Sequence, residues 1–340
     1  MKYTVVYSLN QALRRLLATN PDVLIMGQDI VGAYGGAFKV TKDLSKDYPD
    51  RVLSTPISEA AMTGMAAGMA MRGLRPIVEI MFGDFIVLCA DQMINHIAKF
   101  RWVYNEKVQL PLVLRTPMGG RLGYGATHSQ SLEKIFMGIP GWRIVAINLL
   151  TDPGKLLEKA VEVLEPVLFV ENKWLYPKQP YPIQNGSIEG FPVRFEGQNF
   201  PTCLLSTGDF EDADITIVTY GGMAGVVLEA MKELLLEEEI LCEMVVPTHI
   251  KPFNINPILD SLARTRNLLV FEEGTENFGW GREVIYQTSQ KFSDFKITPR
   301  AIGTRNFPIP SVKKLEMEVL PQTEDVIRAV KSMLSERILR

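Results

Sequence analysis

The chain has 340 residues, of which 46% are hydrophobic and 22% charged, and its formal net charge is −3. This length suits two domains that each bury a core, and the composition is that of an ordinary globular protein. The small negative charge and the scattered basic residues exclude nucleic acid and a membrane surface as expected partners.

The N-terminus has no apolar signal core, and no stretch of about 18 apolar residues occurs, so we expect a cytoplasmic protein. The three cysteines (Cys89, Cys203 and Cys242) form no CxxC motif and lie in apolar surroundings. They are therefore predicted to be buried free thiols in a reducing compartment. The three histidines have no partner at metal-ligand spacing, so no side-chain zinc site is expected.

The first half of the chain alternates helical and strand patterns. Helices are predicted at residues 8–19, after Ser58 and at 85–100, and short apolar strands at 23–26, 51–53, 75–80, 110–115, 142–146 and 166–171. Short apolar strands separated by helices predict a parallel sheet covered on both faces. The fold class is therefore α/β and doubly wound.

The pattern breaks at residues 177–207 into Pro, Gly, Asn and Gln with short apolar pieces, which predicts a linker with some irregular or β structure. A second α/β unit follows, with strands at 214–219, 240–246 and 267–271 and helices at 224–237 and 322–340. The predicted organisation is a first domain at 1–180, a linker at 181–210 and a second domain at 211–340.

One carboxylate stands at a predicted helix start. Ser58 is a good N-cap residue, and Glu59 falls in the first turn. Gly64 and Gly68 make this helix thin, so that another backbone or a ligand can approach it closely. The alternative is that Glu59 only complements the helix dipole.

An aromatic residue, Phe85, follows the strand at 75–80, and the Gly-rich loop after the strand at 110–115 carries His128. Loops at the carboxyl ends of parallel strands line the ligand crevice of such a sheet, so Glu59, Phe85 and His128 are predicted to converge there. Taken singly, Phe85 could be a core residue and His128 a surface residue.

These residues lie in the phrases YGGAFKVTKDL, TPISEAAMTGMAAGMAMRGLRPIVEIMFGDF, DQMINHIAKFR, LVLRTPMGG, GYGATHSQSLE and GTRNFPIP. With them, the sequence resembles the β chain of the thiamine-diphosphate-dependent first component of 2-oxoacid dehydrogenase complexes: the pyruvate, branched-chain and acetoin enzymes. The resemblance covers almost the whole chain. It implies two transketolase-like α/β domains, a pyrimidine-binding domain followed by a transketolase C-terminal domain.

The resemblance also implies residue roles. Glu59 would bond N1′ of the cofactor's aminopyrimidine, Phe85 would pack against that ring, and His128 would face the reacting carbon as a hydrogen-bond donor or proton relay. Ile57 and Gln28 would line the cofactor. Where this chain reads Gly27-Gln28-Asp29 the family has an acid, and the amide of Gln28 can hydrogen-bond but cannot carry a proton.

The same resemblance also implies two metal ions, Mg²⁺ and K⁺. Thiamine enzymes usually bind diphosphate through Mg²⁺ with a Gly-Asp-Gly motif and a later Asn, and neither Gly83-Asp84 nor Gly208-Asp209 has these partners. A separate α subunit is therefore expected to supply the diphosphate and Mg²⁺ site. A structural K⁺ is expected through the main-chain carbonyls of Leu112, Ala160, Val161, Val163 and Glu165.

The resemblance implies that this chain is the β subunit of a 2-oxoacid dehydrogenase, an enzyme that passes an acyl group to a lipoyl carrier. It would be active only with its α subunit, in a heterotetramer that contains a β homodimer and docks on a lipoyl acyltransferase core. One alternative is a two-chain transketolase-like carboligase, or an acyl-transferring enzyme outside such a complex. Another is a non-catalytic scaffold.

Overall fold

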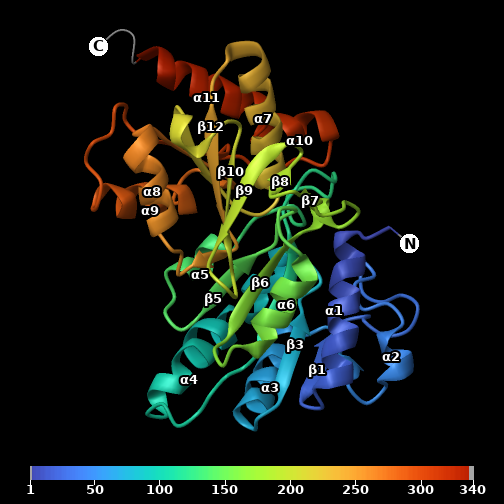
Figure 1. The fold of residues 1–340 in the computed structure, drawn as a ribbon. Coiled ribbons are helices and arrows are strands. Elements are labelled where there is room, and N and C mark those ends of the chain that lie inside the picture. Colours follow the sequence, from blue (N-terminus) through green and yellow to red (C-terminus); the bar gives the residue numbers. More distant parts are fainter. Residues whose placement is uncertain (1, 337–340) are drawn as a thin grey trace.

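The computed structural model describes residues 2–336, and it shows two α/β halves stacked one above the other (Figure 1). The first half contains a seven-stranded sheet with the order β13-β5-β6-β4-β3-β1-β2. The second half contains an eight-stranded sheet with the order β15-β14-β11-β12-β10-β9-β8-β7. The prediction of two α/β units is therefore confirmed.

In the first sheet, β1 to β6 run parallel and β13 is antiparallel to β5. Its strands are β1 (Val23–Gly27), β2 (Val52–Ser54), β3 (Arg75–Glu79), β4 (Val113–Met118), β5 (Arg143–Ala146), β6 (Val167–Asn172) and β13 (His249–Lys251). The α-helices of this half are α1 (Val5–Thr19), α2 (Leu44–Asp47), α3 (Glu59–Met71), α4 (Ala98–Val103), α5 (Lys134–Met137) and α6 (Pro153–Glu162). The 3₁₀ segments are η1 (Gly83–Cys89) and η3 (Lys173–Leu175), and η2 (Gln92–Ile97) is a π-helical turn.

Both faces of this sheet are covered because successive strand residues point to opposite sides. Val23 and Ile25 of β1 lie in the core cluster that contains α1 and α6, whereas Leu24 and Met26 lie in the cluster that contains α3. All five residues of β1 are buried, as the apolar run predicts.

The second sheet is mixed: β15, β14, β11 and β12 are parallel, and β10 to β7 continue it antiparallel. Its strands are β7 (Ile183–Gln184), β8 (Ser187–Ile188), β9 (Phe191–Glu196), β10 (Thr202–Ser206), β11 (Ile215–Thr219), β12 (Cys242–Pro247), β14 (Leu268–Thr275) and β15 (Arg300–Thr304). The helices are η4 (Phe210–Asp212), α7 (Met223–Glu238), α8 (Asn256–Thr265), α9 (Trp280–Ser289), α10 (Lys313–Val319) and α11 (Thr323–Glu336). Residues of α7 and α11 share one core cluster with this sheet, and residues of α8 and α9 share another.

One of the following three segments differs from the sequence-based expectation, and the other two agree with it in part. The predicted linker at 181–210, for which some irregular or β structure was expected, carries β7 to β10. These strands extend the second sheet through a hairpin whose turn residues Asn185 and Gly186 have positive φ. The predicted helix at 85–100 is divided among η1, η2 and α4. The last predicted helix, at 322–340, corresponds to α11 (Thr323–Glu336), and residues 337–340 lie outside the described part.

The cysteines Cys89, Cys203 and Cys242 are buried free thiols, as predicted. Burial raises the pKa of the Cys89 thiol to about 11 and that of Cys203 to about 12, so both are held in the unreactive protonated form. Between residues 2 and 336, no helix combines the length and the apolar character needed to cross a bilayer.

Candidate active site

Glu59 lies where the sequence predicts it, in the first turn of α3. The Ser58 side chain caps the helix by accepting a hydrogen bond from the Ala61 amide at 3.4 Å. The Glu59 side chain is only 6% exposed, and its Oε1 accepts a 3.0 Å hydrogen bond from Nε2 of Gln28. Its Oε2 makes no hydrogen bond to residues 2–336. One carboxylate oxygen is thus oriented by the protein, and the other has no hydrogen-bond partner in the described part of the chain.

The sheet topology brings Gln28 and Glu59 together. Gln28 directly follows β1, and Glu59 follows β2, the strand beside it. Because the two strands are parallel, their carboxyl ends meet at the same edge. Helix α3, which begins at Glu59, packs against η1. Burial, and after it the charge of Glu59, raises the pKa of the Cys89 thiol in η1.

Phe85 and His128 form a second pair at this edge of the sheet. Phe85 lies in η1, just after β3, and His128 lies in the loop that follows β4. Their rings meet edge to face with centroids 5.3 Å apart, and Phe82 approaches His128 at 4.8 Å. Both side chains are half-buried, and Nδ1 of His128 lies 3.0 Å from the Thr127 hydroxyl. The predicted convergence of Phe85 with His128 is therefore seen.

Two other sequence-based expectations fit the geometry less simply. Ile57 lies between β2 and α3 with its side chain 84% exposed, so within this chain it packs against little. Of the five expected K⁺ ligands, the Val161 and Val163 carbonyls accept hydrogen bonds from Nη1 of Arg75 at 2.5 and 3.5 Å. A K⁺ ion would have to compete with this guanidinium, and the site stays a prediction.

A buried ionic network that the sequence did not predict lies in the sheet next to the site. The guanidinium of Arg115, at the middle of β4, binds the carboxylates of Glu79 and Glu171, and Glu171 also accepts from the Tyr176 hydroxyl at 2.7 Å. Burial raises the pKa of Glu79, and the Arg115 charge opposes this shift. Glu79 ends β3 next to Gly27, so the network supports the backbone from which Gln28 extends. The one charged residue of the otherwise apolar run at 110–115 was the available signal.

Asp84 was also missed, although it directly precedes Phe85. Its Oδ1 accepts hydrogen bonds from the backbone amide of Gln130 at 3.3 Å and from the Gln130 side chain at 2.8 Å. Gln130 lies two residues after His128. Asp84 thus joins the segment that carries Phe85 to the loop that carries His128.

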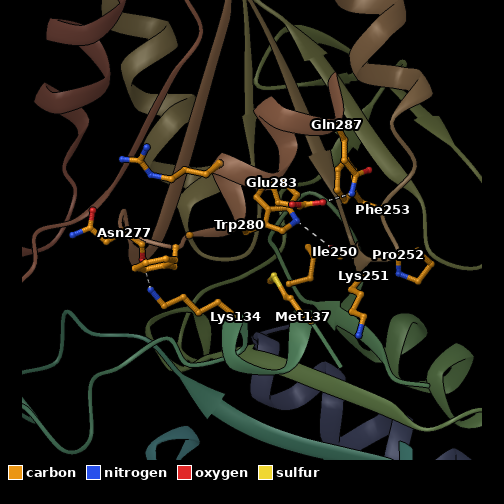
Figure 2. A pocket seen from close by; sticks show the side chains of 14 residues that line it. Lys134, Met137, Ile250, Lys251, Pro252, Phe253, Asn277, Trp280, Glu283 and Gln287 are labelled. Carbon is orange, nitrogen blue, oxygen red and sulfur yellow. Dashed lines mark hydrogen bonds between the residues drawn. The ribbon is translucent and has the colours of Figure 1, made fainter. Parts of the chain in front are cut away.

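A cavity of about 930 Å³ lies elsewhere, at the junction of the two halves (Figure 2). Lys134 and Met137 of α5 face Trp280 and Glu283 of α9 across it. Nζ of Lys134 donates to the Asn277 carbonyl at 2.8 Å, and Nε1 of Trp280 donates to that of Ile250 at 3.1 Å. None of Gln28, Ile57, Glu59, Phe85 and His128 lines this cavity, so it is separate from the candidate active site.

Comparison with known families accounts for both halves. Residues 1–179 match the family described as "Transketolase, pyrimidine binding domain", and residues 209–326 match "Transketolase, C-terminal domain". The chain also resembles the solved structure titled "Split gene transketolase, inactive beta4 tetramer", with a TM-score of 0.72, 20% identity, and coverage of 98% of this chain and 99% of that one. The fold is that of a two-domain transketolase-type protein.

Similarity to curated relatives shows to which family of transketolase-type proteins the chain belongs. The chain is 34% identical over 333 residues to "Pyruvate dehydrogenase E1 component subunit beta-1, mitochondrial" of Oryza sativa subsp. japonica, which covers 96% of this chain and 86% of the relative. It is 32% identical over 351 residues to "Acetoin:2,6-dichlorophenolindophenol oxidoreductase subunit beta" of Bacillus subtilis (strain 168), with coverage of 98% and 97%. The chain belongs to the family of transketolase-like β subunits of the first component of 2-oxoacid dehydrogenases, which are oxidoreductase-type enzymes that use thiamine diphosphate.

Proposed function

We propose that this chain, with an α subunit, decarboxylates a 2-oxoacid and passes the acyl group to a lipoyl carrier. The observation that carries the proposal is the Gln28–Glu59 pair at the start of α3, at the same sheet edge as the Phe85–His128 pair. The pairs supply an oriented carboxylate, an aromatic surface and an imidazole, which are the three groups that the cofactor and its substrate require.

The residues present fit thiamine diphosphate. Its aminopyrimidine carries a ring nitrogen, N1′, with which Oε2 of Glu59 would exchange a proton, while Gln28 holds Oε1 in place. The Phe85 ring would pack against the pyrimidine. When bound, the cofactor supplies the electron sink for loss of CO₂ from a 2-oxoacid.

His128 would act on the substrate rather than on the cofactor's pyrimidine. Its ring is held between Phe82 and Phe85, and its Nδ1 faces the Thr127 hydroxyl. The remaining ring nitrogen, Nε2, would donate a hydrogen bond to the substrate's carbonyl oxygen as negative charge develops there.

The surroundings of the site support a second chain. Apolar side chains on the loops that follow β1, β2 and β4 are exposed: Ile57 by 84%, Tyr34 by 59%, Tyr124 by 46% and Leu122 by 42%. Exposed apolar surface beside a site of this kind is typical of an interface. The α subunit would cover it and hold the diphosphate and Mg²⁺. Two such α–β pairs would join through their β chains into a heterotetramer that docks on a lipoyl acyltransferase core.

The cytoplasm remains the proposed location, because the three buried thiols suit a reducing compartment.

The test is co-expression with an α-type chain of the same genome. We expect thiamine-diphosphate-dependent reduction of an artificial acceptor by a 2-oxoacid, such as pyruvate or one of the branched-chain 2-oxoacids, and reduction of lipoamide when lipoamide replaces that acceptor. Turnover that does not reduce lipoamide but joins the acyl group to an aldehyde would favour the carboligase alternative. No thiamine-dependent turnover, with intact assembly, would favour the scaffold.

A further inference from the structure

The loop that carries His128 has little structure of its own. It follows β4 and turns through Gly119, Arg121, Gly123 and Gly125, all with φ between +74° and +89°. Two backbone hydrogen bonds close within it: the Gly119 amide donates to the Gln130 carbonyl at 3.1 Å, and the His128 amide to that of Gly125 at 3.2 Å. Other groups must therefore hold its first turns.

Two carboxylates of the second half bind three amides of this loop, those of Gly120, Arg121 and Gly123. Oε1 of Glu273, in β14, accepts from Gly120 N at 2.6 Å. Oε1 and Oε2 of Glu316, in α10, accept from Arg121 N at 2.8 Å and Gly123 N at 3.0 Å. Glu316 is fully buried and Glu273 is 7% exposed. Such charge-assisted bonds are among the stronger hydrogen bonds in proteins.

The buried charges of this contact are balanced. Nζ of Lys173 donates to the Gly119 carbonyl, and the Arg121 side chain donates to the Pro321 carbonyl and, at 3.2 Å, to Oε1 of Gln322. Burial lowers the pKa of both cations, that of Lys173 to about 8, and the charges of Glu273 and Glu316 oppose the shift. Two buried cations thus lie beside the two buried carboxylates that accept from the loop amides.

At its far end the loop is held by the first half, since Asp84 binds Gln130. His128 lies between the two attachments. Displacement of Gly120, Arg121 and Gly123 would also move His128, because only a few residues separate them. Few hydrogen bonds within the loop would hold the imidazole in place by themselves.

We propose that Glu316 and Glu273 are positioning residues through which the second domain sets the place of His128. This inference rests on the proposed function for the role of His128, but the placement itself is a property of this chain alone. Neither carboxylate needs to touch the substrate.

The first experiment measures amide hydrogen exchange of the full chain without cofactor, in peptides that cover residues 119–130. Glu316→Gln replaces one acceptor oxygen by an NH₂ group that cannot accept from an amide, and we expect exchange in these peptides to accelerate about tenfold. Glu273→Gln is the second variant, should the first fold poorly. Glu243→Gln is the matched control, because Glu243 is equally buried in this domain but pairs with Arg264 at 2.7 Å.

The second experiment is a double-mutant cycle in the assembled enzyme. We expect Glu316→Gln to lower kcat about tenfold with little change in KM or cofactor affinity, and to add nothing in a His128→Ala background. Unchanged loop exchange, an equal effect of Glu243→Gln, or additive losses in the cycle would overturn the proposal. If the wild-type assembly shows no thiamine-dependent turnover, the proposed function fails, and hydrogen exchange alone decides whether the carboxylates place the loop.

Discussion

The carboxylate of Glu59 has two unlike oxygens: Oε1 accepts from Gln28, and Oε2 has no partner among residues 2–336. We expect Glu59→Gln to lower thiamine-dependent turnover by about 10²–10⁴-fold, because an amide cannot exchange a proton with N1′. Folding and assembly should persist, since Ser58 still caps α3. Turnover of the assembled variant, together with its thermal melting curve, checks this. Wild-type activity would refute the assigned role.

Gln28 provides a second residue-scale prediction. In the variant Gln28→Glu, a second carboxylate would lie about 3 Å from that of Glu59, and two carboxylates so close share a proton. The folded variant would then bind more protons than its unfolded chain above about pH 5, so its stability should fall as pH rises. Relative to wild type, we expect a loss of about 1–3 kcal/mol to develop between pH 5 and 8. Chemical denaturation at these pH values measures it; parallel pH profiles for the two proteins would contradict it.

At the scale of elements, α3 has one face buried on the sheet and one face of small residues turned outward. Ala66, Ala67 and Ala70 are buried, whereas Gly64 and Gly68 are exposed. A Cβ at Gly68 would meet nothing within 4 Å inside this chain. The small residues are therefore not needed for the fold of the chain itself.

We expect Gly68→Leu to disrupt the β dimer by overpacking while changing the stability of the chain by only about 1 kcal/mol or less, since Leu is the better helix former. Light scattering reports the assembly, and thermal melting reports the fold. Gly138→Leu, at another open glycine outside α3, is the control. An intact dimer in Gly68→Leu would show that this face is not the interface.

At the scale of the whole molecule, strand β13 connects the two halves. It follows β12 of the second sheet along the chain but pairs with β5 of the first sheet. His249 lies in this strand opposite Val145, its Nε2 has no partner among residues 2–336, and the Phe200 ring is 5.4 Å away. Burial, followed by the Arg143 charge, lowers the pKa of His249 to about 4.

This imidazole should make the junction of the halves sensitive to acid. Between about pH 6.5 and 4 the unfolded chain binds a proton that the folded chain does not, so stability should fall as pH falls, by up to about 1.4 kcal/mol per pH unit from this group. His249→Asn should flatten that dependence in denaturation experiments at pH 7, 6 and 5. His96→Gln, at an exposed histidine, should leave it unchanged. Equal slopes for wild type and His249→Asn would refute the assignment.

Local patterns in the sequence predicted much of this molecule. The apolar runs of β1, β4 and β6 and the Ser58–Glu59 helix start depend on neighbouring residues, and the structure has them in place. The convergence of Phe85 with His128 also followed, because the carboxyl ends of parallel strands share one edge. By contrast, only a linker with some irregular or β structure was predicted where β7 to β10 extend the second sheet, since short antiparallel strands at a sheet edge carry a weak apolar pattern.

The sequence by itself determined the family, the two α/β units and the chemically distinctive residues Glu59, Phe85 and His128. Only the tertiary structure decided what holds them. Gly120 and Glu273 are 153 residues apart, Arg121 and Glu316 are 195 apart, and β13 crosses back to the first sheet. A single buried carboxylate, or a strand of three residues, produces no periodic pattern in the sequence. Its partner is decided by the packing of the whole chain.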